Sequence, residues 1–203
     1  MIDRCRSDDS ELCREMVTTF GLSEAQMRHA AERYRLGKSR SGKTIFWMMD
    51  EQGTFLDGHI GSALPDGDFA SSWISTLLKR RYPEAASYVS FPHCLFGQHL
   101  LTSDLRPQTS SVCIVESERT AVVLSELFPE KLWMAYVYPA NLTVHRFKPL
   151  QGRRVILFPR PDSTGAEYLS ALDLANQIHS HYPSIDFHVS DIFKTILCYD
   201  QFL

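Results

Sequence analysis

The 203-residue sequence predicts an α/β protein, in which a mostly parallel sheet flanked by helices follows a small α+β region with a β-hairpin. From residue 112 onward, short apolar runs alternate with amphipathic stretches, which is typical of strands joined by helical crossovers. Before that point, two helical stretches precede two strand-like runs on either side of the turn sequence 50–53. The share of apolar residues, 44%, and of charged residues, 22%, is that of a globular protein.

The N-terminal region is expected to cover residues 1–101 and to begin with two helices. Residues 10–20 predict the first helix, which Gly21 ends. Ser23 and Gln26 form a capping box for the second, which runs to about Arg33.

The rest of this region predicts a hairpin, a turn, a helix and a linker. Residues 44–49 and 54–60 predict the two strands of the hairpin. Residues 64–68 predict a turn, and 73–81 a short helix that ends before Pro83. The polar stretch 102–111, which contains Pro107, predicts a linker into the second domain.

The second domain is expected to span residues 112–203 and to alternate strands with helices. The expected elements are strand 112–115, helix 118–127, strand 132–137, a turn, strand 155–158, helix 164–182 and strand 185–189. Right-handed crossovers between these strands predict a parallel sheet.

Two carboxylates follow predicted strands of this sheet. Glu116 comes directly after 112–115, and Asp162 comes shortly after 155–158. Open α/β sheets bind their ligands at the carboxyl ends of their strands, so these side chains are expected within about one metal shell of each other. Carboxylate oxygens are ligands that Mg²⁺ prefers.

Three segments resemble motifs of the Toprim fold, which bacterial primases, topoisomerases and some nucleases share. Ile114-Val-Glu-Ser-Glu-Arg-Thr-Ala121 is similar to the family's acidic strand–helix motif, and 154–165 to its Asp-x-Asp motif. Ala140-Asn141-Leu142 resembles its small-residue–Asn turn. This resemblance covers roughly residues 94–203. Shorter segments, at 34–37, 45–47 and 94–101, resemble little-characterised Toprim proteins of bacterial mobile elements.

The resemblance implies a primase-like protein that acts in DNA replication or processing on a mobile element. It implies that Glu116 and Asp162 are catalytic residues and ligands of Mg²⁺, with Glu116 as ligand or general base. It also implies DNA or RNA as a partner, together with other replication proteins. The expected nucleic-acid contacts are Arg160, Arg119, Asn141, Arg153 and Arg154.

One residue departs from the family pattern, because Arg160 stands where the family has the first aspartate of its Asp-x-Asp pair. Glu116 and Asp162 would then hold a single, weakly bound ion, with Glu118 or Asp191 as helpers. Alternatively, Arg160 takes the place of the cation and binds phosphate directly. The chain would in that case be a non-catalytic module that binds nucleic acid or protein and retains the fold.

A pattern typical of nucleotide binding lies in the N-terminal region. Residues 37–44, Gly-Lys-Ser-Arg-Ser-Gly-Lys-Thr, match the phosphate-binding loop of NTPases. That loop needs a helix after it, whereas 45–49 is strand-like. We therefore expect a hairpin connection here that binds no nucleotide.

Charge and cysteine content narrow the class of protein further. The net charge is -3, so positive charge is only local, at 33–43, 79–81 and 148–154, which are either phosphate-binding clusters or solvated helix ends and turns. The five scattered cysteines form no zinc-ribbon pattern and suggest a reducing compartment. Neither a membrane span nor a signal peptide is recognisable, so we expect a cytoplasmic protein without a membrane partner.

Overall fold

The computed structural model describes residues 2–63, 69–86, 90–103 and 111–192. The chain forms two compact units, Met1–Ser103 and Asp104–Leu203. The expected turn at 64–68 and most of the expected linker lie outside the described residues, while residues 102 and 103 belong to a short helix.

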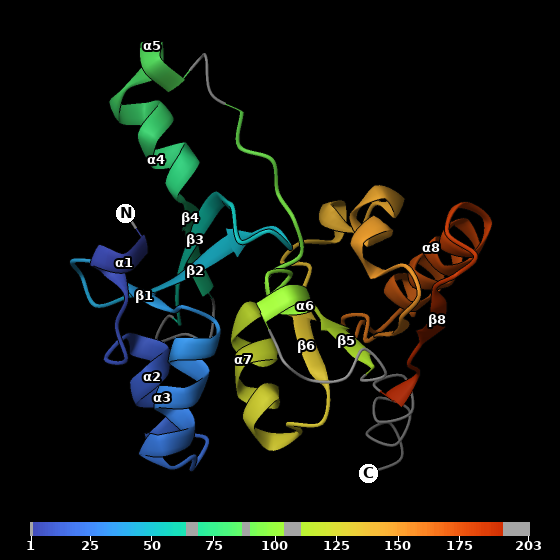
Figure 1. The fold of residues 1–203 in the computed structure, drawn as a ribbon, viewed down its shortest axis with the longest axis horizontal. Helices are drawn as coiled ribbons and strands as arrows, with labels where there is room; N and C mark the ends of the chain where they lie inside the picture. The colour runs from blue at the N-terminus through green and yellow to red at the C-terminus, as the bar shows by residue number, and fades with distance from the viewer. Residues whose placement is uncertain (1, 64–68, 87–89, 104–110, 193–203) are drawn as a thin grey trace. The chain divides into compact units, whose positions relative to one another are not determined.

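The first unit contains an antiparallel sheet and several helices (Figure 1). Its helices are α1 (Ile2–Cys5), α2 (Glu11–Thr18), α3 (Glu24–Arg33), α4 (Ile74–Arg81), α5 (Pro83–Ala86) and α6 (Leu100–Ser103). Its strands are β1 (Gly37–Lys38), β2 (Thr44–Met49), β3 (Phe55–Ala63) and β4 (Phe69–Trp73), in the order β1-β2-β3-β4. The expected hairpin is β2 and β3, and β1 is the strand before the expected hairpin connection at 37–44, whereas β4 was not predicted.

The strand β2 is the centre of this unit, because all six of its residues are buried. Alternate side chains of a strand point to opposite faces, so β2 contributes to two apolar layers. On one face, the ring of Phe46 lies edge-on to Phe96, with 5.6 Å between their centroids. On the other, Trp47 is fully buried and packs with Ile45 and Met49.

The second unit is built on a four-stranded parallel sheet in the order β6-β5-β7-β8. Its strands are β5 (Val112–Val115), β6 (Leu132–Ala135), β7 (Arg154–Leu157) and β8 (Asp186–Val189). Its helices are α7 (Glu118–Leu127) and α8 (Ala166–His181), with the 3₁₀ segments η1 (Pro139–Asn141) and η2 (Val144–Leu150) between β6 and β7. The expected mostly parallel sheet flanked by helices is confirmed.

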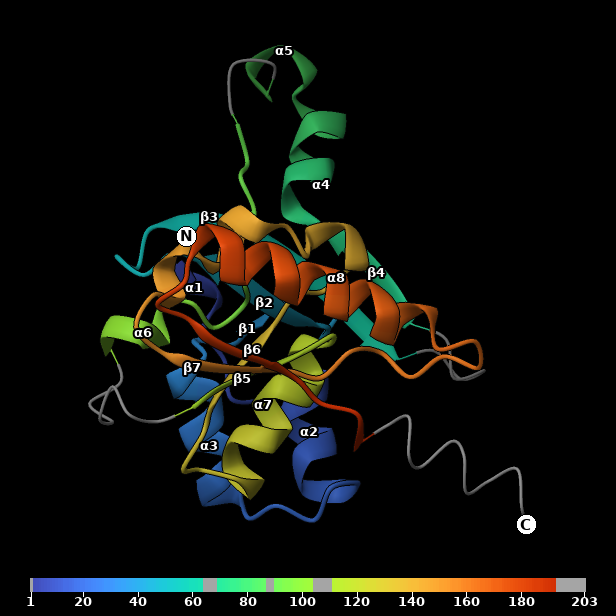
Figure 2. The same cartoon turned by 90° about the vertical axis from the view of Figure 1, so that its right-hand side faces the viewer.

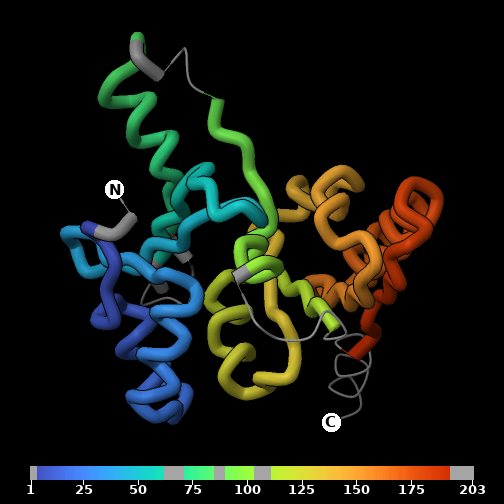
Figure 3. The backbone as a smooth tube through the Cα atoms, viewed as in Figure 1, coloured from blue at the N-terminus to red at the C-terminus, as the bar shows by residue number. Residues whose placement is uncertain are grey.

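The chain adds β6 on one side of β5 and then β7 and β8 on the other side, so the order of the strands reverses within this sheet. The helix α7 leads from β5 to β6 on one side, whereas η1 and η2 return the chain to β7 on the other side of β5 (Figure 3). Figures 1 and 2 both place the sheet between α7 and α8. The point where the strand order reverses therefore lies between β5 and β7, which is where open α/β sheets bind ligands.

Within the described residues, no helix is long and apolar enough to cross a membrane.

Candidate functional site

The candidate site lies at the carboxyl ends of β5, β6 and β7. Backbone hydrogen bonds hold these ends together: the Phe158 N–H donates to the Ile114 carbonyl at 2.8 Å, and the Val137 N–H donates to the Glu116 carbonyl, also at 2.8 Å. The first residues after β5 and β7 are thus neighbours at the switch point. Here a guanidinium nitrogen of Arg160 lies 3.7 Å from a carboxylate oxygen of Glu116.

Two residues that sequence analysis did not single out belong to this site. Tyr136, directly after β6, is buried, and its pKa is raised first by burial and then by the charge of Glu116. Glu167, in the first turn of α8, adds negative charge near Glu116. The site therefore combines Glu116, Tyr136, Arg160 and Glu167.

Opposing effects act on the Glu116 carboxyl group. Burial raises its pKa, the nearby Arg160 guanidinium lowers it, and the Glu167 carboxylate raises it again. The net shift is upward, so burial and the second carboxylate outweigh Arg160. These effects favour the protonated, uncharged form of Glu116 relative to a carboxyl group in water.

The Asp162 carboxylate accepts hydrogen bonds at the start of α8. Its carboxylate accepts hydrogen bonds from the Thr164 hydroxyl and, at 3.0 Å, from the Ala166 backbone N–H. These donors lower the pKa of Asp162, the Thr164 hydroxyl most. A carboxylate here satisfies free N–H groups of the first helical turn.

This donor set does not fit the Mg²⁺ site that the family resemblance implied. A guanidinium lies at ion-pair distance from Glu116, and helix donors engage Asp162. Across residues 2–63, 69–86, 90–103 and 111–192, no three His, Cys, Asp or Glu side chains are grouped to hold a metal ion. Of the expected helpers, Glu118 is buried at the start of α7, and Asp191 follows β8.

Two of the expected nucleic-acid contacts share the carboxyl edge with Arg160. Arg119 lies in the first turn of α7, three residues after Glu116. Asn141 lies in η1, where its side-chain N–H donates to the Tyr136 carbonyl at 3.0 Å and so holds the turn after β6.

The other two lie at the opposite edge. Arg154 begins β7 and Arg153 directly precedes it, and Arg154 pairs with Asp186 at 3.7 Å. At about 3.3 Å per residue, the four-residue strand separates them from Arg160 by more than 10 Å. The structure thus brings Arg119, Asn141 and Arg160 to one edge, without the other two.

The NTPase-like loop has another structural role in the first unit. Residues 37–38 and 44–49 are the paired strands β1 and β2, so the loop is a hairpin connection as expected. The Thr44 hydroxyl is buried, donates to Ser10 at 3.1 Å and accepts from the Leu12 N–H at 2.9 Å. This hydroxyl therefore caps α2. That the loop binds no nucleotide stays a prediction.

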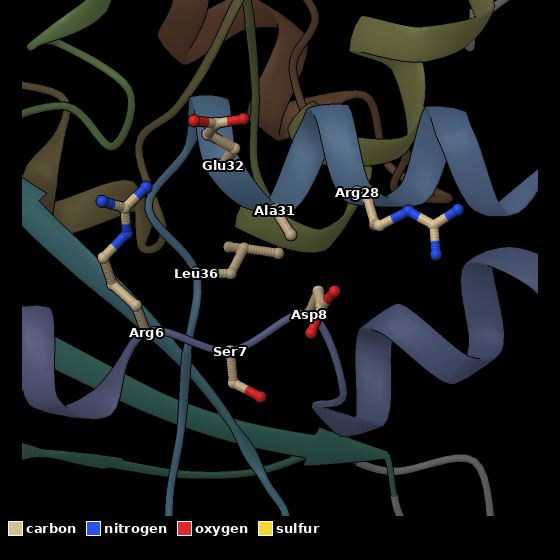
Figure 4. Close-up of a pocket in the computed structure, with 7 residues that line it drawn as sticks. All are labelled: Arg6, Ser7, Asp8, Arg28, Ala31, Glu32 and Leu36. Carbon is tan, nitrogen blue, oxygen red and sulfur yellow. The ribbon is translucent and has the colours of Figure 1, made fainter.

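A pocket in the first unit is not associated with any expected site residue (Figure 4). It is lined by Arg6, Ser7, Asp8, Arg28, Ala31, Glu32 and Leu36. Side chains of both positive and negative charge line it, and Arg28 pairs with Glu24 at 3.2 Å. The lining therefore selects no one class of ligand.

Comparison with solved structures shows that the chain has the fold of a primase core. It is similar to the DnaG catalytic core, with a TM-score of 0.60, 14% identity, and coverage of 93% of this chain and 69% of that one. For the zinc-binding and RNA polymerase domains of Aquifex aeolicus primase, the TM-score is 0.57, with 13% identity and coverage of 88% and 50%. For the RNA polymerase domain of Mycobacterium tuberculosis primase DnaG, solved with double-stranded DNA, the TM-score is 0.51, with 13% identity and coverage of 91% of this chain and 67% of that one.

This chain thus spans between half and about two thirds of the length of these primase chains. No curated protein matches its sequence significantly. A family model matches residues 10–161, three quarters of the chain, and the protein therefore belongs to the family described as Domain of unknown function (DUF6371).

Proposed function

We propose that this chain is a primase-like protein of nucleic-acid metabolism with a degenerate metal site, which binds nucleic-acid phosphate through Arg160. The observation that carries the proposal is the Arg160–Glu116 pair at the switch point of the sheet. The primase-core fold supports a role in nucleic-acid metabolism, and one similar primase domain was solved with double-stranded DNA.

The geometry leaves Arg160 available to a phosphate group. Its side chain is 58% exposed, and its distance to Glu116, 3.7 Å, exceeds the roughly 2.7–2.9 Å of a charge-assisted hydrogen bond. Guanidinium presents five N–H donors in a planar fork that fits phosphate oxygens in pairs. An incoming phosphate therefore competes with a loosely engaged carboxylate.

Arg160 also weakens the binding of Mg²⁺ at the same place. Two unit charges of the same sign about 4 Å apart repel by about 4 kcal/mol at an effective dielectric constant near 20, and a divalent ion is repelled more strongly. In the catalytic alternative, Glu116 and Asp162 hold Mg²⁺ in spite of Arg160, while the Oδ2 oxygen of Asp162 also accepts a hydrogen bond from the Ala166 N–H. Carriage on a mobile element and contact with other replication proteins rest on the sequence resemblance alone.

The substitution Arg160→Asp tests this proposal. It removes the guanidinium and adds a carboxylate beside Glu116, so we expect calorimetry to show Mn²⁺ affinity raised by more than about tenfold. Affinity for an oligonucleotide without metal should fall, because Arg160 no longer pairs with phosphate. Arg154→Asp is the matched control, since Arg154, at the start of β7, is almost as exposed as Arg160 and pairs with a carboxylate at the same distance, 3.7 Å.

Unchanged metal and oligonucleotide affinities in Arg160→Asp would contradict the proposal. Equal effects of the two substitutions would mean that net charge, rather than the position of Arg160, governs binding. Tight Mn²⁺ binding by the unmodified chain, abolished by Glu116→Ala and by Asp162→Ala, would favour the catalytic alternative.

A further inference from the structure

The helix α4 ends in a concentration of exposed positive charge. Its last turn consists of Lys79, Arg80 and Arg81, and residues 73–82 include no acidic residue. All three cations are exposed, and so is Tyr82, which caps the helix and is 53% accessible. In a chain with a net charge of -3, this is a local feature.

Aromatic rings support two of the three cations. The Lys79 ammonium lies 5.8 Å from the ring centroid of Phe91, and the Arg81 guanidinium lies 5.6 Å from that of Tyr82. Both distances are within the range of cation–π attraction. Because successive helical residues are about 100° apart, the three side chains spread around the end of the helix.

The other end of α4 is fixed in the sheet by a buried carboxylate. Asp57 of β3 is fully buried and accepts hydrogen bonds from the Ser75 N–H at 3.0 Å and from the Ser75 hydroxyl at 2.6 Å. His93 approaches the same carboxylate at 3.2 Å. A negative charge at this position satisfies donors of the first turn and complements the helix dipole.

Stacked rings add to this anchor. The Trp73 ring, directly before α4, stacks on His59 at 4.7 Å and on His93 at 4.0 Å between centroids. The base of the helix is therefore held in place, whereas its basic end leads away from the sheet of the first unit (Figures 1 and 2).

We propose that the basic end of α4, consisting of Lys79, Arg80, Arg81 and Tyr82, is a contact site for single-stranded nucleic acid. This inference rests on the proposed function and adds a second contact, in the other unit of the chain. The cations bind backbone phosphates, and the exposed Tyr82 ring stacks on a base. The exposed ring beside the cations favours this partner over an acidic peptide or an anionic membrane, because unpaired bases offer it a face.

The test measures the binding of the full chain to fluorescent 20-nucleotide oligothymidylate and oligouridylate by anisotropy at several salt concentrations. The variant Arg80→Ala/Arg81→Ala should weaken binding by about tenfold and reduce the slope of log affinity against log salt by about 1.4, the loss of two phosphate contacts. The matched control is Arg14→Ala/Arg28→Ala, which removes the same charge from two other exposed helical arginines.

A second pair of variants tests the aromatic contact. Tyr82→Ala should weaken binding by at least about fivefold, whereas Tyr82→Phe, which keeps the ring, should bind like the unmodified chain. Equal losses for the two Tyr82 variants, or a duplex of the same length bound as tightly as the single strand, would overturn the choice of single strands.

The outcomes separate this inference from the proposed function. If the chain binds the oligonucleotides and the Arg80/Arg81 variant behaves like its control, the contact site on α4 is wrong. If that variant weakens binding and Arg160→Ala does not, the contact site on α4 is supported and the phosphate contact at Arg160 is wrong. Binding to anionic vesicles of phosphatidylserine, with none to either oligonucleotide, overturns both.

Discussion

At the scale of single residues, Glu116 connects the local electrostatics of the candidate site to the stability of the chain. Burial and Glu167 raise its pKa despite the nearby Arg160. A raised pKa means that the folded chain retains a proton that the unfolded chain has released. Stability from this group is therefore present below the ordinary pKa of 4.5 and is lost as pH rises through the higher folded value.

We expect Glu116→Gln to remove this dependence. As pH rises from about 4.5, the free energy of unfolding of the unmodified chain should fall relative to that of the variant, and the difference should then level off. Urea unfolding at a series of pH values measures it. Asp162→Asn is the control of opposite sign, because the pKa of Asp162 is lowered and its contribution is lost as pH falls through values below 3.8. A pH-independent difference for Glu116→Gln would contradict the raised pKa.

The candidate site was only partly predictable at this scale. Glu116 stands out because it follows a strand that is apolar on both faces. Tyr136 ends another apolar run and resembles an ordinary core residue in the sequence. Its proximity to Glu116 depends on the pairing of β5 with β6, and that of Arg160 on the pairing of β5 with β7, which periodicity does not reveal.

At the scale of elements, the strands found from the sequence are those with continuous or alternating apolar residues. The strand β4 was missed because Ser71 and Ser72 interrupt its apolar pattern. It forms a strand because its backbone pairs with β3. The bounds of β1 could not be predicted, because it has only two residues and its pairing with β2 defines it. Short edge strands of this kind depend on tertiary context.

Gly58 in β3 allows α4 to pack closely against the sheet, because it has no side chain. A Cβ atom on Gly58 would lie 2.6 Å from the terminal methyl carbon of Ile74 and 2.9 Å from the Trp47 ring. Since both neighbours are packed in one apolar cluster, Gly58→Ala should lower the free energy of unfolding by about 1–3 kcal/mol.

The added substitution Ile74→Val should recover part of this loss, because it removes the methyl group that the new Cβ meets. Urea unfolding of the two single variants and the double variant gives the coupling energy. Gly53→Ala is the control: no atom lies within 4 Å of its added Cβ, and its cost comes from a φ of +78°. Ile74→Val should leave that cost unchanged. Additive effects of Gly58→Ala and Ile74→Val would mean that Ile74 is not the obstacle.

At the scale of the whole molecule, the α/β class and the parallel sheet were predictable, because the order of strands and helices after residue 112 constrains the topology. Affinity for nucleic acid is not evident from composition, since the net charge is -3. Any such affinity must come from local sites. The two proposed here lie in different units, Arg160 in the second and the end of α4 in the first.

Two contact sites on one chain predict a dependence on strand length. A strand long enough to engage both sites makes its second contact within one complex, at a high effective concentration, so its affinity exceeds that for either site alone. A 6-nucleotide strand and a 20-nucleotide strand should therefore differ strongly in affinity for the unmodified chain. The same ratio should be smaller for Arg160→Ala and for Arg80→Ala/Arg81→Ala, because each retains one site. A longer strand also offers more binding registers, but this contribution is common to all three proteins and cancels in the comparison. Ratios that are equal in the three proteins, measured by anisotropy at one salt concentration, would show that a single strand does not engage both sites.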